Sequence, residues 1–340
     1  MEMSIHEKYM QYCLQLAVQG QGHNKTNPLV GCVIVYQDKI IAQGYHQSYG
    51  EAHAEVNAFA QIADETILKE STVYVNLEPC SHQGKTPPCT LLFKNAPCKT
   101  LVVGMLDPNP LVAGKGIAQI ENLGIEVISG VLQQQCETLN EPFVKSIKNQ
   151  KPYVIAKWAQ SADGFIGISD ERTEISNALV NLLAQKWRTE IDCYLIGHQT
   201  LKTDNPQLTV REIEGRNPAR AVIGRIKSLD FKFFNDNADL FVFTNEKLPL
   251  AESSLKSFAF KNLDDILNTL YENTIGTVMI EGGAKTIQSF LDAGLVDEIR
   301  CITNLELILN TGVIAPQFTN FSKTSRQIME NNAIDFYHKK

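Results

Sequence analysis

Short apolar runs alternate with amphipathic segments along almost the whole chain, and this alternation constrains the fold more than any other feature. Strand-like runs such as LVGCVIV at 29–35 and TVYVNLE at 72–78 are separated by helix-like stretches such as 53–63. Strands that alternate with helices predict an α/β fold whose sheet is covered by helices on both faces. The runs at 29–35 and 39–46 flank only the tripeptide YQD at 36–38, which predicts a hairpin and therefore a mixed sheet.

The first half continues in the same way up to a polar linker. Further helices are expected at 87–96, 116–124 and 133–147, and further strands at 100–106 and 125–131. The segment KNQKP at 148–152 is polar and ends in proline, which is typical of a linker. A chain of 340 residues is also long for one core. We therefore predict two domains, 1–149 and 150–340.

The alternation restarts after the linker and predicts a second α/β domain. Its strands are expected at 153–161, 192–197, 219–225, 240–245, 277–283 and 297–303, and its helices at 177–190, 263–273 and 284–294. No sequence repeat relates the two halves.

Charge and composition exclude several classes of partner. The formal net charge is −7, and no arginine precedes Arg172, so the first half lacks the usual reader of bases and phosphates. We therefore expect no nucleic-acid partner. No apolar run approaches the roughly 18 residues of a membrane span, and the N-terminus has no cleavable apolar core. We expect a cytoplasmic protein without a membrane partner, whose eight cysteines are thiols or metal ligands rather than disulfides.

Two neighbouring segments carry residues that suit a metal ion. The first, GEAHAEVNAFAQI at 50–62, contains His53 and Glu55; the second, NLEPCSHQGKTPPCT at 76–90, contains Cys80 and Cys89. Imidazole and thiolate are common zinc ligands, and three such ligands leave the fourth tetrahedral position for water, as in a catalytic site. Residues two apart on a helix point about 200° from each other, so His53 and Glu55 reach one site only across a helix N-terminus.

The combination of HAE, EPC and a second Pro-Cys is the signature of zinc-dependent nucleobase deaminases. In that signature the Glu is the acid and base of the reaction and not a ligand, which assigns this role to Glu55. The alternative interpretation is one core histidine and two unrelated thiols. One departure is evident, because eight residues separate Cys80 from Cys89, whereas the signature usually has two.

Longer motifs resemble a known family. They are TNPLVGCVIV, GYHQSYGEAHAEV, EPCSHQGKTPPC and DPNPLVAGKG in the first half, and SADG, KWR, LKTDNPQLTVR and EGGAKTIQSFLDAGLVDEI in the second. Together they resemble the bifunctional riboflavin biosynthesis proteins, and the long insert between the cysteines belongs to that family. The resemblance implies a cytidine-deaminase-like α/β/α sandwich with a mixed sheet, followed by a dihydrofolate-reductase-like α/β domain.

The resemblance also implies two activities and their cofactors. The first domain, with one zinc ion per chain, would deaminate 2,5-diamino-6-ribosylamino-4(3H)-pyrimidinone 5′-phosphate, a pyrimidine ribonucleotide. The second domain would use NADPH to reduce the ribosylamino group to ribitylamino. We also expect a homo-oligomer, a dimer or a tetramer.

The family's substrate-binding residues can be placed on the first domain by the matching motifs. For the deaminase they are Asn27, His46, His82, Lys85, Asp107 and Asn109. Lys85 would supply a positive charge from the insert between the two cysteines, which suits a phosphorylated substrate.

In the second domain the resemblance implies a catalytic pair, two substrate-binding arginines and a cofactor site. These are Lys157 and Glu281 at the reacting sugar carbon, Arg188 and Arg211 for the substrate, and Ala159, Thr200, Asp204 and Gly283 for the cofactor. The strand-Gly-Gly-helix segment MIEGGAKT suits phosphate binding, but it is not the GxGxxG fingerprint of a standard dinucleotide fold.

Two positions depart from the family's pattern. Glu174 stands where the family usually has Trp, and Gly224 stands where an acidic residue is frequent. A charge in place of a flat apolar ring predicts that Glu174 points to solvent and that the second domain reduces its substrate less efficiently than relatives with Trp.

Two other functions remain open from the residues alone. One is a deaminase of another nucleotide or of RNA with a non-catalytic second domain, and the other is a zinc-stabilised scaffold. Glu55 discriminates against the scaffold, because a purely structural zinc site needs a fourth ligand and no neighbouring acid or base.

Overall fold

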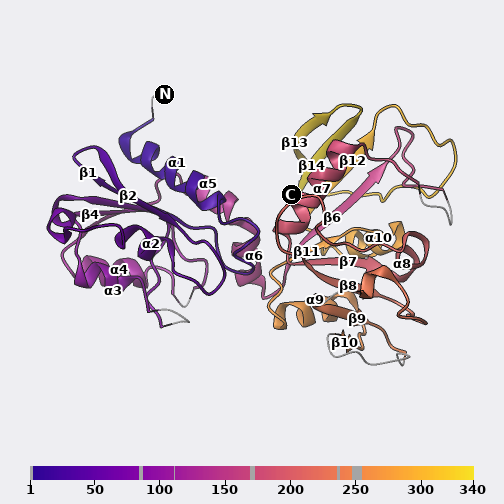
Figure 1. The fold of residues 1–340 in the computed structure, drawn as a ribbon, viewed down its shortest axis with the longest axis horizontal. Coiled ribbons are helices and arrows are strands. Elements are labelled where there is room, and N and C mark those ends of the chain that lie inside the picture. Colours follow the sequence, from indigo (N-terminus) through magenta and orange to yellow (C-terminus); the bar gives the residue numbers. More distant parts are fainter. Residues whose placement is uncertain (1–2, 84–86, 111, 169–172, 236–237, 247–254) are drawn as a thin grey trace. The chain divides into compact units, whose positions relative to one another are not determined.

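The structure, a computed structural model, describes residues 3–83, 87–110, 112–168, 173–235, 238–246 and 255–340. It divides into two compact units, Met1–Gln150 and Lys151–Lys340. Figure 1 shows that each unit is built on its own sheet. The division falls one residue after the boundary that the sequence predicts.

The first unit is a five-stranded mixed sheet. Its strands lie in the order β2 (Lys39–Tyr45), β1 (Gly31–Tyr36), β3 (Thr72–Leu77), β4 (Thr100–Met105) and β5 (Glu126–Ser129). Strand β1 is antiparallel to both β2 and β3, whereas β3, β4 and β5 run parallel. The predicted hairpin and the mixed sheet are thus confirmed. The carboxyl ends of β3 and β4 lie at the same edge of the sheet, because the two strands are parallel.

Helices cover both faces of this sheet. Figure 1 shows α1 (Ile5–Val18) and α5 (Gln133–Leu139) on one face, and α2 (Ala54–Phe59), α3 (Thr90–Asn95) and α4 (Lys115–Glu121) on the other. The chain also forms a 3₁₀ helix at Glu65–Glu70 and ends this unit with α6 (Glu141–Asn149). A buried layer of aliphatic side chains, among them Val33, Val75 and Val103, joins the sheet to the helices.

The predicted helix over 133–147 is wrong in one respect, because the structure breaks it into α5 and α6 at Asn140. The Asn140 side chain accepts a hydrogen bond from the Leu29 amide (2.8 Å) and donates one to the Leu29 carbonyl (3.0 Å). This pairing with a distant backbone segment fixes Asn140 outside a helical conformation. Such a partner cannot be recognised from local sequence periodicity.

The second unit is a nine-stranded sheet. Seven parallel strands lie in the order β10 (Leu255–Phe258), β9 (Leu240–Phe243), β8 (Ala219–Ile223), β7 (Cys193–Gly197), β11 (Thr277–Ile280), β6 (Tyr153–Gln160) and β12 (Glu298–Asn304). The antiparallel strands β14 (Asn332–Lys339) and β13 (Phe321–Met329) extend the sheet beyond β12. Figure 1 shows this hairpin in yellow at the C-terminal end of the chain.

Two apolar layers cover this sheet. One layer packs α9 (Leu263–Glu272) and α10 (Ala284–Asp292) on the sheet through residues such as Leu270 and Phe290. The other packs α7 (Ala178–Glu190) and α8 (His198–Asp204) through residues such as Trp187 and Leu201, and includes a 3₁₀ turn at Lys232–Phe234. Strands β10, β13 and β14 and helix α8 are not predicted from the sequence. Strand β13 has no buried face within this unit, so it lacks the alternation that marks a half-buried strand.

Candidate functional site

Three side chains from three elements of the first unit meet at one point. His53 is the residue before α2, Cys80 follows β3, and Cys89 is the residue before α3. The His53 Nδ1 atom lies 3.2 Å from the Cys89 Sγ and 3.6 Å from the Cys80 Sγ. The ligand atoms of all three lie within 4.8 Å of one another. The helix start that the sequence predicts at His53 is confirmed.

The three groups influence one another's ionisation strongly. Hydrogen bonding to Cys89 lowers the pKa of the Cys80 thiol to about 4, and His53 acts in the same direction. The same contact raises the pKa of Cys89, and burial adds to this effect. The contact with Cys80 raises the pKa of His53. A negative charge is therefore stabilised at Cys80, between a positive partner and a backbone N–H donated by Cys89 (3.2 Å).

The donor set of this cluster suits zinc. One imidazole nitrogen and two sulfur atoms are the softer ligands that zinc accepts, and a divalent ion favours the thiolate form of both cysteines. Three protein ligands with an adjoining cavity leave a coordination position for a small molecule. The residues present thus fit a catalytic zinc ion and not a closed structural one.

Glu55 is the second residue of α2, two residues after His53, and is only 4% exposed. Burial raises the pKa of its carboxyl, so the group holds a proton more readily than an exposed glutamate does. It lines the same cavity as His53 and Cys80. A buried carboxyl beside a metal site has the properties of a group that accepts and returns protons.

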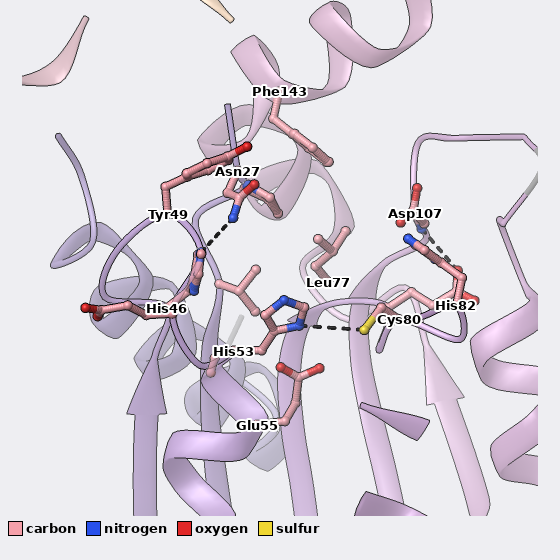
Figure 2. A pocket seen from close by; sticks show the side chains of 16 residues that line it. Asn27, His46, Tyr49, His53, Glu55, Leu77, Cys80, His82, Asp107 and Phe143 are labelled. Atoms are coloured by element: carbon pink, nitrogen blue, oxygen red, sulfur yellow. Dashed lines mark hydrogen bonds between the residues drawn. The ribbon is translucent and has the colours of Figure 1, made fainter. Parts of the chain in front are cut away.

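A cavity of about 320 Å³ opens over these groups. Figure 2 shows His53 and Glu55 below it, three residues along one side, two along the other and one above: Asn27, His46 and Tyr49; His82 and Asp107; Phe143. Its lining is mainly polar below and partly aromatic above, which suits a flat heterocycle that carries polar substituents.

His46 has a defined tautomer in this cavity. Its Nδ1 lies 3.0 Å from the Ala52 carbonyl oxygen, which can only accept, so Nδ1 carries the hydrogen. The Nε2 atom then accepts from the Asn27 side-chain amide at 2.9 Å. Burial lowers the pKa of His46, which favours this neutral form. Asn27 and His46, predicted from separate segments, are therefore brought together as one unit.

The remaining predicted contacts of this domain lie on two segments. His82 and Asp107 line the cavity, and the backbone N–H of Asn109 donates to the Asp107 carboxylate at 2.8 Å. Burial raises the pKa of Asp107, and the Asn109 amide opposes this effect. Lys85 lies outside the described residues.

Several lining residues were not predicted from the sequence, among them Tyr49, Leu77, Glu78 and Phe143. Leu77 and Glu78 directly precede the zinc motif at the end of β3, so their position next to Cys80 was a usable signal. Phe143 comes from α6, far along the chain, and no local pattern distinguishes it from a core residue.

The second unit holds a charged cluster at the carboxyl ends of its central strands. The Lys157 Nζ donates to the Glu281 Oε1 at 2.8 Å, and the Arg188 Nη2 lies 3.8 Å from the Glu281 Oε2. Burial raises the pKa of Glu281, but Lys157 and Arg188 more than offset this, so the net shift is downward. The predicted Lys157, Glu281 and Arg188 therefore form one cluster with an ionised carboxylate.

The other predicted residues of this domain lie on several segments. Thr200 packs against the turn before α10, where a Cβ added at Gly283 would lie 3.1 Å from the Thr200 Oγ1. Ala159 lies in β6, and Asp204 is exposed at the end of α8. Arg211 has an exposed side chain, and its amide donates to Gln185. A hydroxyl and the backbone amides at a helix start are groups that hold the phosphates of a dinucleotide, so this region fits NADPH.

Both departures from the family pattern have a structural counterpart. Glu174 is exposed, as predicted. Gly224 has φ of +123°, and a Cβ added there would lie within 2.4 Å of the His198 Nδ1. An acidic side chain does not fit at Gly224 unless His198 moves.

Comparisons with known proteins match both halves. Residues 3–105 match the cytidine and deoxycytidylate deaminase zinc-binding region, and residues 152–304 match the RibD C-terminal domain. The riboflavin biosynthesis protein RibD of Bacillus amyloliquefaciens is 37% identical over 92% of this chain and 87% of its own length. That of Escherichia coli is 33% identical over 86% of each chain. The chain belongs to the RibD family.

Solved structures agree over the full length. A diaminohydroxyphosphoribosylaminopyrimidine deaminase/5-amino-6-(5-phosphoribosylamino)uracil reductase from Thermotoga maritima superimposes with a TM-score of 0.91, 31% identity and 99% coverage of each chain. The Acinetobacter baumannii RibD gives 0.90, 31% and 100% of each. The predicted family and fold class are confirmed.

Membership in this family identifies the kind of protein. It is a bifunctional enzyme of riboflavin biosynthesis that acts on a small molecule, with a zinc-dependent deaminase domain and an NADPH-dependent reductase domain. None of the helices in the described residues is long and apolar enough to cross a membrane.

Proposed function

We propose that the first unit deaminates 2,5-diamino-6-ribosylamino-4(3H)-pyrimidinone 5′-phosphate and that the second reduces the ribosylamino group of the product to ribitylamino. The proposed deamination is supported by the convergence of His53, Cys80 and Cys89 beside the buried Glu55 at one cavity. The proposed reduction is supported by the cluster of Lys157, Glu281 and Arg188.

In the deamination, His53, Cys80 and Cys89 would hold the zinc ion, which supplies Lewis-acid activation of water at the cavity. Glu55 takes a proton from the attacking water and passes it to the ring nitrogen. It then takes the proton of the newly formed hydroxyl group and delivers it to the exocyclic amine, so that the exocyclic C–N bond breaks, a carbonyl forms and ammonia leaves. The raised pKa of Glu55 suits this exchange, because the group must be both a base and an acid within one turnover.

Substrate binding in this proposal uses both sides of the cavity. The neutral His46 and the amide of Asn27 offer one fixed hydrogen-bonding edge. His82, Asp107 and Asn109 offer another on the opposite side, and Lys85 would supply a positive charge for the phosphate. The aromatic rings of Tyr49 and Phe143 provide apolar area for the pyrimidine.

In the reduction, bound NADPH would supply hydride to C1 of the ribose. The bond from that carbon to the ring oxygen breaks, and the oxygen takes a proton. The Lys157 ammonium, held by Glu281, is the proton donor that the cluster offers. Arg188 and Arg211 would hold the substrate, and Ala159, Thr200, Asp204 and Gly283 would contact the cofactor.

We further propose that the enzyme is a cytoplasmic homo-oligomer that does not bind nucleic acid. Support for the location is that all eight cysteines are free thiols. Support for self-association is the exposure of large apolar side chains in the second unit, including Ile308, Ile314 and Ile328. The net charge of −7 argues against a nucleic-acid partner.

The substitution Glu55→Gln tests the assignment of the first site. It removes a proton carrier and no ligand, so deamination should fall by about 10²–10⁴-fold while the zinc content stays at about one per chain. Metal analysis and product formation are measured on the same preparation, with the NADPH-dependent reduction of the deaminated nucleotide as an internal control. Loss of zinc, or near-normal deamination, would contradict the role of Glu55.

A further inference from the structure

Glu78 is a buried carboxylate at the end of β3, two residues before Cys80, and it is only 5% exposed. Four backbone N–H groups donate to it. Its Oε2 accepts from Asp107 (3.1 Å) and Gly114 (2.9 Å), and its Oε1 accepts from Gly116 (2.8 Å) and Ile117 (3.3 Å). Each carboxylate oxygen therefore receives two donors.

All four donors come from one stretch of chain, residues 107–117, which follows β4 and leads into α4. One oxygen joins the beginning of this stretch, at Asp107, to a point seven residues later, at Gly114. The other oxygen holds the first turn of α4. The stretch also approaches β3 closely at Gly116, where an added Cβ would lie 2.1 Å from the Pro79 carbonyl oxygen. The backbone at Asp107 and at the start of α4 is thus fixed against Glu78 and Pro79, the two residues that precede Cys80.

This stretch carries two of the proposed substrate contacts. Asp107 lines the cavity, and its carboxylate accepts a hydrogen bond from the backbone N–H of Asn109. Anchoring the Asp107 backbone therefore sets where both side chains stand relative to Cys80. A binding group that is held in place before the substrate arrives does not lose conformational freedom on binding, and this raises affinity.

The chemistry of this site requires a carboxylate. Burying a charged group is costly, so an apolar residue would be the cheaper filling for this space. Only a carboxylate offers acceptor oxygens on both branches, and it can receive four N–H donors at once. A glutamine of the same size would turn an NH₂ group toward two backbone N–H donors and leave them without an acceptor.

We propose that Glu78 is a positioning residue of the deaminase: through the backbone N–H groups that it accepts, it holds Asp107 facing the cavity, with Asn109 beside it, at a fixed distance from the metal ligand Cys80. This inference rests on the proposed function of the first unit, because it acts through the proposed contacts Asp107 and Asn109. It predicts that the effect of Glu78 on catalysis passes through substrate binding.

The test is steady-state deamination of the pyrimidinone nucleotide by the full chain with zinc bound. Glu78→Gln should raise KM about tenfold or more, and kcat and the zinc content should change little. Glu78→Asp keeps the charge with a shorter reach and should recover part of the loss. If Glu78→Gln lowers the soluble yield, Glu78→Asp serves for the same comparison. The matched control is Glu7→Gln, which removes another carboxylate that accepts a backbone N–H (from Ser4, 2.7 Å) but lies outside the cavity lining.

A double-mutant cycle separates positioning from general support of the fold. Asp107→Ala retains the backbone N–H that donates to Glu78 but removes the contact that Glu78 is proposed to position. The KM effects of Glu78→Gln and Asp107→Ala should therefore be less than multiplicative when combined, whereas a merely structural role gives independent effects. Independent effects, or a loss of zinc and kcat at unchanged KM, would overturn the inference.

The same cycle distinguishes this inference from the proposed function. If Asp107→Ala raises KM and both Glu78 variants leave it unchanged, the positioning role is wrong and the substrate site stands. If Asp107→Ala leaves KM unchanged, the proposed contact is wrong, and the role of Glu78 is wrong with it.

Discussion

His53, Cys80 and Cys89 can be predicted from the sequence because each belongs to a short motif: His53 and Cys89 directly precede helices, and Cys80 follows a strand. In the structure their ligand atoms lie within 4.8 Å of one another. The order of the strands is the only long-range feature needed to bring the three motifs together. Glu78 differs in kind. Its partners are backbone N–H groups 29 to 39 residues away, and side-chain letters do not reveal which way an amide points. Motifs identify groups that do chemistry more readily than groups that hold a loop.

Gly224 is the residue where the structure and the family pattern differ most concretely. Its φ of +123° lies in a region that L-amino acids avoid, and the His198 ring occupies the space of a Cβ. Gly224→Asp, which introduces the residue type frequent in the family, should lower the free energy of unfolding of the second unit by about 1–3 kcal/mol. Thermal unfolding measures this change.

Gly50 supplies the control for the backbone term. Its φ is +86°, and an added Cβ there has no neighbour within 4 Å, so Gly50→Ala carries the backbone strain alone. A larger loss for Gly224→Asp than for Gly50→Ala is expected, because only the first also displaces a ring. Equal losses would mean that the contact with His198 costs nothing.

At the scale of elements, most strands with a buried face were predicted, whereas β10 and β13, which have no buried residue, were missed. Strand β1 and its neighbour β3 carry alternating or continuous apolar residues. Strand β13, by contrast, has seven exposed residues in succession, and its pairing with β14 depends on backbone hydrogen bonds and cross-strand pairs such as Arg326 with Asp335. Hydrophobic periodicity reports burial, so an edge hairpin leaves little trace of it.

The segment around Glu174 carries a prediction at this scale. An aromatic side chain offers a large apolar surface to a flat cofactor ring, whereas Glu174 is exposed and carries a charged group instead of a ring. Glu174→Trp should therefore raise the rate of NADPH-dependent reduction several-fold and leave deamination unchanged. Glu174→Gln, which removes the charge without adding a ring, is the control and should behave as the parent does. A Trp variant with an unchanged or lower reduction rate would contradict the proposed packing.

At the scale of the whole molecule, each proposed site is contained in one compact unit. The ligands and the cavity of the deaminase lie within Met1–Gln150, and the Lys157–Glu281 pair lies within Lys151–Lys340. The sequence predicts this division from a polar, proline-ended linker. It does not predict the width of the second sheet, because the last strands follow a stretch without clear periodicity.

A fragment of residues 1–149 should therefore fold and bind about one zinc ion per chain. Circular dichroism and metal analysis of the purified fragment test this. Cys80→Ser in the same fragment is the control and should lose the metal. An insoluble fragment that is rescued only by co-expression of residues 150–340 would show that the two units fold as one core.

The central claim is that one chain catalyses two successive steps on one nucleotide, and product masses test it most directly. The purified full chain is incubated with the diaminopyrimidinone ribonucleotide with and without NADPH. Without NADPH the product should show the mass change of an amine replaced by oxygen, and with NADPH a further gain of two hydrogen atoms. An unchanged substrate, or a deaminated product that NADPH does not alter, would contradict the account.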